Sequence, residues 1–307
     1  MRTLQVGAQH ELIFCIDPHL NEAQTLAQLS SYITAQGANA EPNVDTVQFV
    51  ALIHLIEALQ AILENDCTVT DELPGWHRLQ EATHLLAHAQ WLAEGDMLTI
   101  QCLVVKTRYL MYAQEQQSAY GAIGEAVRLC YLTGLHTQPR DPDFSPFELH
   151  IRQRTFWSLY CLERSVSQAC GVPYLIRDSD IQIDLPASLD DKLIGGSEQL
   201  PDEDPDLPGI PFLWSTIKGA RLSAEIWDKA FCVNARRPVD EEFVVTMDAR
   251  IENIRRRFPR KLQWTIEGLR DVPTPDHIQS FGTQAMVLHL VSLDPLPHFR
   301  ACAHLLY

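Results

Sequence analysis

His84 and His88 lie four residues apart, and Glu81 precedes them by about one helical turn. On a helix this spacing places the two imidazoles on one face, where they could hold a zinc ion. The pattern supplies no third ligand, and the chain contains no H-E-x-x-H sequence. We therefore predict a surface or partly buried histidine pair at this position and not a metal site.

Asp178, Asp180 and Asp184 form a second cluster of candidate ligands, because carboxylates are the groups that Ca²⁺ prefers. The segment lacks the glycine and the distal glutamate of an EF-hand loop. Aspartate is also favoured in turns, since its carboxylate accepts hydrogen bonds from the nearby backbone. We interpret the three aspartates as structural residues of a polar loop.

Gly121 and Gly124 suggest a phosphate-binding loop only superficially, because no strand precedes them and the remaining glycine and lysine of such a loop are absent. We expect them to permit close helix packing. No Ser-His-Asp order, G-x-S-x-G elbow or dinucleotide-binding fingerprint is present either. The prediction is therefore that the chain is not an enzyme.

Charged side chains around an aromatic helix are the next candidates, namely Arg128, Glu148, Arg152, Arg154 and Glu163. Most are explained by a solvated helix face with pairs at i,i+4. An arginine that points inward must find a carboxylate, because an unpaired charge is costly to bury. We predict a partly buried pair between Glu163 and either Arg154 or Arg128.

Phe156 and Trp157 are the large apolar side chains of that same helix. Because they are adjacent, both cannot point straight into one core, and one is expected to face a neighbouring helix. Replacing either by alanine should cost roughly 3–5 kcal/mol if the side chain is buried.

Two helices with clear boundaries position these residues. The first follows residue 117 and stops at Gly134. The second opens at Ser145-Pro146 with Glu148 closing a capping box, and it ends near Gly171. Apolar residues spaced by three and four predict further helices over residues 17–37, with Asp17 as the N-cap, and over 45–64, 74–94, 96–115, 212–233 and 239–258. Short loops between neighbours favour a single all-α domain of antiparallel packed helices.

Composition narrows the classes of function. The chain has 307 residues and a net charge of −16, which opposes binding to a phosphate backbone. Its eight cysteines include no C-x-x-C pair, so we predict no structural zinc and treat them as small hydrophobes in a reducing compartment, the cytosol or nucleus. No signal peptide or membrane span is expected. Residues 187–211 are rich in Asp, Glu, Pro and Gly, and we predict a mobile acidic surface loop.

Three motifs in residues 117–186 carry a resemblance to a known family. They read GAIGEAVRLCYLTGLH, ELHIRQRTFWSLYCLERSVSQACGVPYLI and DSDIQIDLP. In this order they resemble the middle homology region of fungal zinc binuclear-cluster regulators, also called the fungal-specific or xylanolytic-activator transcription factor domain. Glu163-Arg164 stands where that family has Asp-Arg, and Val172 replaces the Arg of Gly-Arg-Pro. Weaker similarity extends over residues 43–269, whereas residues 270–307 are not typical of the family.

The resemblance implies one helical regulatory domain over residues 1–307 that acts in transcription, in the nucleus. In the family, DNA is bound by a separate zinc-cluster module with two C-x-x-C-x6-C halves, which this sequence does not contain. We therefore expect no cofactor here, and DNA contact only through such a module or through a partner protein. A small-molecule effector and a homodimer are compatible with the family. The expected structural or regulatory core residues are Arg128, Glu148, Arg154, Phe156, Trp157, Glu163, Arg164, Gly171, Pro173 and Asp180.

Three explanations fit a chain that resembles this family and lacks the zinc-cluster module. It can be a regulatory domain alone, a fragment, or a relative that lost its DNA-binding module. Two alternative functions of another class are a helical small-molecule-binding module and a scaffold for protein partners. Tight retention of a small molecule would favour the former, whereas promoter association only through a partner would favour a regulator or a scaffold.

Overall fold

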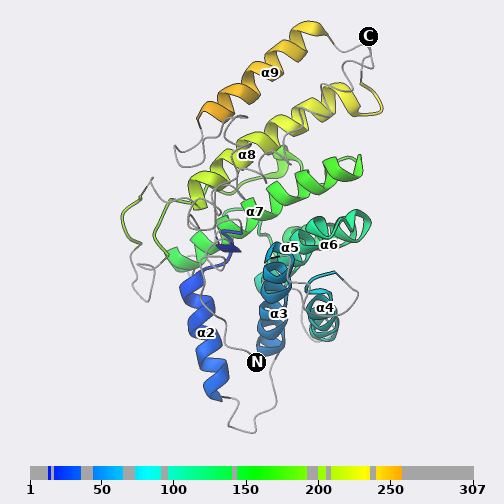
Figure 1. Cartoon of the computed structure of the whole chain (residues 1–307). Helices are drawn as coiled ribbons and strands as arrows, with labels where there is room; N and C mark the ends of the chain where they lie inside the picture. Colours follow the sequence, from blue (N-terminus) through cyan, green and yellow to red (C-terminus); the bar gives the residue numbers. More distant parts are fainter. Residues whose placement is uncertain are drawn as a thin grey trace, which may run out of the picture.

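The computed structural model describes residues 13–14, 17–35, 44–64, 73–90, 96–139, 144–191, 200–204, 209–235 and 240–257. This part of the chain is helical and contains no β-strand beyond one isolated bridge between Thr137 and Gln182, which confirms the all-α prediction (Figure 1). The helices are α2 (Glu22–Ala35), α3 (Val44–Glu64), α4 (Trp76–Gln90), α5 (Met97–Tyr112), α6 (Gln116–Leu132), α7 (Pro146–Cys170), α8 (Gly209–Ile226) and α9 (Glu241–Arg256). A 3-10 turn, η1 (Asp178–Asp180), and a π-helical turn, η2 (Trp227–Phe231), complete the set.

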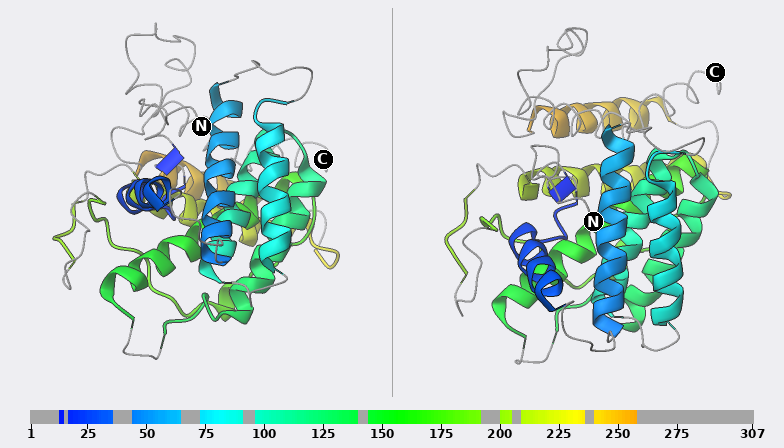
Figure 2. Two further views of the ribbon diagram at one scale, coloured as in Figure 1. Left: turned by 90° about the horizontal axis from the view of Figure 1, so that it is seen from below. Right: turned by 60° about the horizontal axis from the view of Figure 1, so that its bottom comes forward.

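The helices pack in a series that largely follows the chain. Helix α3 contacts α4 and α5, α5 contacts α6 and α7, α7 contacts α8, and α8 carries α9 at the outer edge (Figures 1 and 2). Helix α2 runs outward beside the bundle from the side where α7 begins. Central helix α7 contributes three of the largest fully buried side chains, Phe156, Trp157 and Tyr160.

The N-cap and C-cap of α7 are those predicted from the sequence, and α5 also has a side-chain N-cap. The backbone N–H and the hydroxyl of Ser145 both donate to Glu148 at 2.8 Å, and the N–H of Glu148 donates back to the Ser145 hydroxyl at 3.2 Å. Gly171 ends α7 with a φ of 64°, a conformation that suits glycine. At α5 the carboxylate of Asp96 accepts the Thr99 N–H at 2.8 Å.

The predicted N-cap of the first helix was wrong. Asp17 does not open α2; its carboxylate is fully buried and accepts from Arg108 Nη2 at 2.7 Å. Helix α2 instead begins at Glu22, and Asn21 Oδ1 caps it by accepting the Gln24 N–H at 2.8 Å. Leaving a buried carboxylate without a cation costs more free energy than leaving a helix end without a side-chain cap. Asp17 therefore pairs with the distant Arg108 and does not cap a helix.

The glycine that permits close helix packing is Gly75 and not the pair predicted in α6. A Cβ at Gly121 would meet nothing within 4 Å, and a Cβ at Gly124 would be in ordinary contact with Arg128 at 3.5 Å. At Gly75, with a φ of +77°, a Cβ would lie 2.6 Å from the carbonyl oxygen of Ala58 in α3. This contact sets how closely the start of α4 approaches α3.

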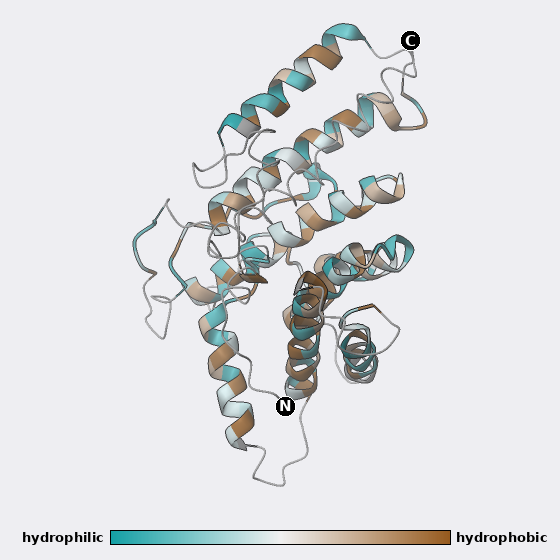
Figure 3. Ribbon diagram, in the orientation of Figure 1, coloured by the Kyte–Doolittle hydropathy of each residue, from teal (hydrophilic) through white to brown (hydrophobic). Residues whose placement is uncertain are grey.

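Helix α3 is long and apolar enough over Val44–Leu63 to cross a membrane by length and composition alone, which the sequence analysis did not anticipate (Figure 3). The core helix of a soluble protein passes the same test, and 44% of the tested window is buried inside the molecule. Helix α3 packs on α4 and α5, and its Glu57 forms an ion pair with Arg78 of α4 at 3.2 Å, with His54 3.6 Å from the same carboxylate. These contacts give the apolar composition of α3 an explanation within the fold.

The acidic segment 187–211 is only partly described. Its first residues pack against the protein: Ser188 and Leu189 are buried, and Ser188 exchanges two hydrogen bonds with the backbone of Asp204. Asp191 forms an ion pair with Arg154. These contacts hold the first part of the segment against the protein, and the mobility of the segment as a whole stays a prediction. Residues 192–199 and 205–208, like the atypical residues 270–307, lie outside the described part.

Candidate functional site

Arg154 is the first buried charge of α7, and its side chain is 3% exposed. Its Nε donates to the carbonyl of Pro18 and its Nη2 donates to that of Leu20 at 2.9 Å. Its two Nη atoms hold both carboxylate oxygens of Asp191, at 2.5 and 3.0 Å. We call these contacts the Arg154 clamp, because they join the segment before α2, the middle of the molecule and the acidic segment.

Glu163 pairs with its sequence neighbour Arg164 at 2.7 Å and not with Arg154 or Arg128, so both predicted pairs were wrong. Its carboxylate also accepts from the Ser167 hydroxyl at 2.9 Å and from the Leu175 N–H at 2.7 Å. Complete burial raises the pKa of Glu163, and Arg164 and these hydrogen bonds oppose that effect. The pair fixes the start of the loop that leaves α7.

The guanidinium of Arg164 is held between two aromatic rings. It lies 4.6 Å from the centroid of Tyr160 and 3.9 Å from that of Tyr174, and it donates to the Ile176 carbonyl at 2.5 Å. Asp178 accepts from Arg164 at 3.1 Å and from the Tyr160 hydroxyl at 2.8 Å. Cation–π contacts and a charged hydrogen bond thus place the Asp178 carboxylate at the molecular surface, where its side chain is 47% exposed.

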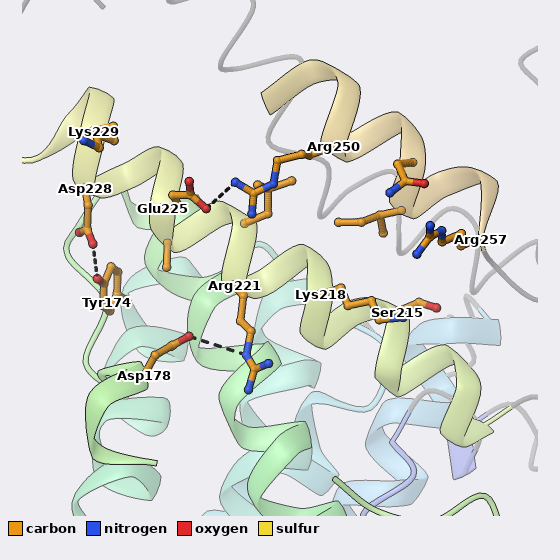
Figure 4. Close-up of a pocket in the computed structure, with 14 residues that line it drawn as sticks. Tyr174, Asp178, Ser215, Lys218, Arg221, Glu225, Asp228, Lys229, Arg250 and Arg257 are labelled. Atoms are coloured by element: carbon orange, nitrogen blue, oxygen red, sulfur yellow. Dashed lines mark hydrogen bonds and ion pairs between the residues drawn. The ribbon is translucent and has the colours of Figure 1, made fainter. Parts of the chain in front are cut away.

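Asp178 lies in the wall of a groove between α8, α9 and the loop after α7, with a volume of about 630 Å³ (Figure 4). We call it the α8–α9 groove. Its lining includes five cationic side chains, Lys218, Arg221, Lys229, Arg250 and Arg257, and three carboxylates, Asp178, Glu225 and Asp228. The whole chain has the opposite balance, with 24 Lys and Arg against 40 Asp and Glu.

Only part of this positive charge is compensated within the groove. Arg250 forms a 2.7 Å ion pair with Glu225 across the two helices, whereas Arg221 Nε is 3.7 Å from Asp178. The Asp228 carboxylate accepts a hydrogen bond from the neutral Tyr174 hydroxyl at 2.7 Å. The groove is therefore a place where a negatively charged group would find donors.

A second hollow of about 660 Å³ adjoins the first and shares Tyr174, Asp178 and Asp228 with it. Gly171 and Pro173 line this hollow, together with the aromatic rings of Trp227 and Phe231, whose centroids are 5.9 Å apart. The loop from Gly171 to Asp178 thus forms one wall of both hollows.

The remaining predicted residues lie elsewhere. The side chain of Arg128 is exposed on α6, Glu148 belongs to the cap of α7, and Asp180 accepts from the Ser179 hydroxyl at 3.1 Å. Phe156 and Trp157 are both fully buried, and the Trp157 indole donates to the Asp184 carbonyl at 2.9 Å. Their functional roles stay predictions.

The metal-like patterns serve other purposes in the described residues. His84 is exposed, and Glu81 approaches His54 at 3.5 Å and Arg78 at 3.4 Å; the side chain of His88 lies outside the described part. Within the described ranges no group of three or more His, Cys, Asp or Glu is arranged to hold a metal ion.

Three cysteines of the described core, Cys102, Cys130 and Cys161, are buried, which confirms their interpretation as small hydrophobes. Burial raises the pKa of the thiols of Cys130 and Cys161 to about 12. At neutral pH these thiols are protonated and are poor nucleophiles.

Lys218, Arg221 and Arg250, which give the groove much of its charge, are not among the residues predicted from the sequence. Lys218 and Arg221 stand three apart on α8, and Arg250 of α9 stands seven residues before Arg257, which directly follows that helix. That spacing was readable from the sequence. The facing of the two helices was not, because it depends on the small apolar cluster around Met247 that joins them.

Comparison with known proteins gives the family. Residues 25–235 match the fungal specific transcription factor domain. The transcriptional activator protein acu-15 of Neurospora crassa is 27% identical over 160 residues, which is 51% of this chain and 16% of the relative. The probable transcription factor FUP6 of Fusarium proliferatum is 34% identical over 116 residues, 37% of this chain and 17% of the relative. A putative transcriptional regulatory protein of Saccharomyces cerevisiae, YJL206C, is 23% identical over 323 residues, 90% of this chain and 41% of the relative.

No solved structure matches the chain. The match to the family covers more than half of the 307 residues and includes the three motifs of residues 117–186. The chain spans less than half of the length of each of these relatives. By this match, the chain belongs to the family of the fungal specific transcription factor domain.

Proposed function

We propose that the chain is the regulatory domain of a fungal zinc-cluster-type transcription factor, that residues 1–307 act as one unit in the nucleus, and that it has no enzymatic activity. The observation that carries this proposal is the match of residues 25–235 to the family domain. The relatives' names agree with it, since they describe transcriptional activators and regulators.

In this proposal DNA is contacted by a separate zinc-cluster module or through a partner protein. The net charge of −16 opposes the release of counterions that drives binding to a phosphate backbone. In a gel-shift titration from about 50 to 200 mM salt the isolated chain should show no sequence-specific duplex binding. Specific retardation that resists competitor DNA would contradict this division of roles.

A reporter assay tests the regulatory role itself. The chain is inserted between a heterologous DNA-binding domain and a constitutive activation domain, and reporter output is compared with the same fusion lacking the chain. We expect a change in output in either direction, because the sequence does not fix the sign of regulation. The matched control carries Trp157→Ala, which removes a fully buried side chain and should abolish the change. Equal output with and without the native chain would refute the proposal.

A further inference from the structure

The α8–α9 groove gathers positive charge in a strongly acidic protein. Its lining holds five cations against three carboxylates, whereas the chain as a whole has 24 against 40. A solvated helix face of this protein would be expected to follow the acidic average. The excess of cations at one hollow therefore calls for an explanation specific to that hollow.

The cations differ in how far they are committed to other groups. Arg250 is engaged with Glu225 at 2.7 Å. The side chains of Lys218 and Arg257 have no hydrogen-bond or ion-pair partner among the residues that the structure describes. Arg221 has only the 3.7 Å approach to Asp178, whose carboxylate already accepts from Arg164. Three positive charges are thus wholly or largely available to a ligand.

The position of Arg221 is fixed without using its hydrogen-bonding capacity. Its guanidinium carbon lies 5.2 Å from the ring centroid of the buried Trp157, so the ring supports one face of the guanidinium. The side chain is 50% exposed and belongs to the lining of the groove, and its guanidinium is turned toward Asp178 (Figure 4). A planar guanidinium held in this way can bind a carboxylate or a phosphate through two parallel hydrogen bonds.

The shape of the groove favours a small organic ligand over a nucleic acid or a long peptide. Its volume of about 630 Å³ is in the range of small-molecule sites. The cations come from two sides of the groove, Lys218 and Arg221 from α8 and Arg257 from the position directly after α9, instead of forming one extended row. Ile254, which is partly buried, adds apolar surface that a carbon skeleton could contact.

From this geometry we infer that the α8–α9 groove binds a small organic anion with at least two negative charges, a dicarboxylate or tricarboxylate or a phosphate ester. One end of the anion contacts Arg221 and Lys218, and the other contacts Arg257. This inference rests on the proposed function, since such a ligand would act as the effector of the regulatory domain.

Binding of this kind would also couple the ligand to the position of α9. In the described structure α9 is held to α8 by a small apolar cluster, with Met247 of α9 against Leu222, Ile226 and Ala230. The ion pair of Arg250 with Glu225 also links the two helices. An anion that bridges Arg221 and Arg257 adds a third link, and so favours the state in which α9 is docked.

Isothermal titration calorimetry on the full chain tests the inference. Citrate and glucose 6-phosphate serve as the carboxylate and phosphate probes, and glucose serves as the neutral control, at about 50 mM salt, where charge screening is weak. We expect saturable binding of at least one anion and none of glucose. The preferred probe distinguishes the carboxylate from the phosphate source.

The decisive variants are Arg257→Gln and Arg256→Gln. The two residues are neighbours at the end of α9 and lose the same charge, but only Arg257 lines the groove, whereas Arg256 lies with Glu252 at 2.8 Å. Arg257→Gln should raise the Kd by about tenfold or more, and Arg256→Gln by less than about twofold. If Arg257→Gln does not melt like the parent, Lys218→Gln is used in its place as the variant that removes a cation from the groove.

Two results would overturn the inference: no saturable binding of either anion, or equal weakening by the two arginine variants. Neither result affects the reporter assay of the proposed function, which is scored without added ligand. A functional reporter fusion combined with no anion binding would thus disprove the groove as an effector site and leave the regulatory role in place.

Discussion

Replacing Arg154 by methionine removes every donor of the Arg154 clamp while keeping a long, flexible apolar side chain in the same space. The carbonyls of Pro18 and Leu20 lose their charged donor, and Asp191 loses both of its hydrogen bonds. The perturbation therefore tests whether buried polar contacts, and not packing alone, hold the segment before α2 to the bundle.

The size of the effect follows from the burial of each partner. Each buried acceptor left without a donor costs about 1–3 kcal/mol. Asp191 is 24% exposed and can be partly rehydrated, which places its share near the lower end of that range. We expect Arg154→Met to lower the free energy of unfolding by about 3–5 kcal/mol, as for other buried pairs broken from one side.

Urea denaturation followed by circular dichroism measures this loss. The matched comparison is Asp191→Asn, which keeps one acceptor oxygen and leaves Arg154 its two backbone acceptors, so it should cost less than Arg154→Met, about 1–3 kcal/mol. The reasoning is refuted if Arg154→Met unfolds within about 1 kcal/mol of the parent, or if the two variants are equally destabilised.

Three further predictions concern stability. Phe156→Ala should cost about 3–5 kcal/mol, because the ring is fully buried. Gly75→Ala should cost about 1–3 kcal/mol, because φ is +77° and a Cβ would meet a backbone carbonyl, whereas Gly121→Ala should stabilise by about 0.5–1 kcal/mol. Burial, with the charge of Arg154, lowers the pKa of His150 to about 3. Because this folded-state pKa lies below the unfolded value, the unfolded chain takes up the proton first, and stability present above about pH 6.5 is lost as the pH falls, by about 1.4 kcal/mol per unit for this group.

Thermal and urea unfolding check all three. If Phe156→Ala has the same melting temperature as the parent, the conclusion that α7 is the central helix of the core is contradicted. For the glycines, the two alanine variants must shift stability in opposite directions. For the histidine, His150→Leu should remove its share of the loss between about pH 6.5 and 5.5, so an unchanged slope in that variant would show that other groups cause it.

Local signals in the sequence predicted α7 well, whereas distant partners could not be predicted. The capping box joins Ser145 and Glu148, which are three residues apart, so it can be recognised from one short segment of the sequence. Arg154 finds its acceptors 134 and 136 residues earlier in the chain, and no spacing rule covers that distance. The same gap explains why Asp17 was misread as a helix cap.

The residues of the candidate site also divide into those that the sequence motifs predicted and those that depend on contacts between distant segments. Gly171 and Pro173 belong to recognisable motifs, and both line the hollow next to the groove. The cations of the groove stand on two helices joined by a segment that carries no motif, and their meeting depends on how α9 packs on α8. A spacing rule can place charges on one face of a single helix, but only the pairing of two helices makes a site.

The contacts around Asp17 also set an order of events during synthesis. Arg108, which pairs with Asp17, follows it by 91 residues, and Arg154, which binds the carbonyl of Pro18, follows that residue by 136. At a translation rate of about 5–20 residues per second, Arg154 leaves the ribosome roughly 7–27 s after Pro18. Asp17 lacks its cation only until Arg108 emerges, roughly 5–18 s after it, whereas Pro18 waits for Arg154 throughout the longer interval. Leu20, which is 2% exposed in the finished fold, cannot be buried before the helices that cover it have been made. A chaperone that holds this segment on the nascent chain would therefore protect the region that is made early but docks late.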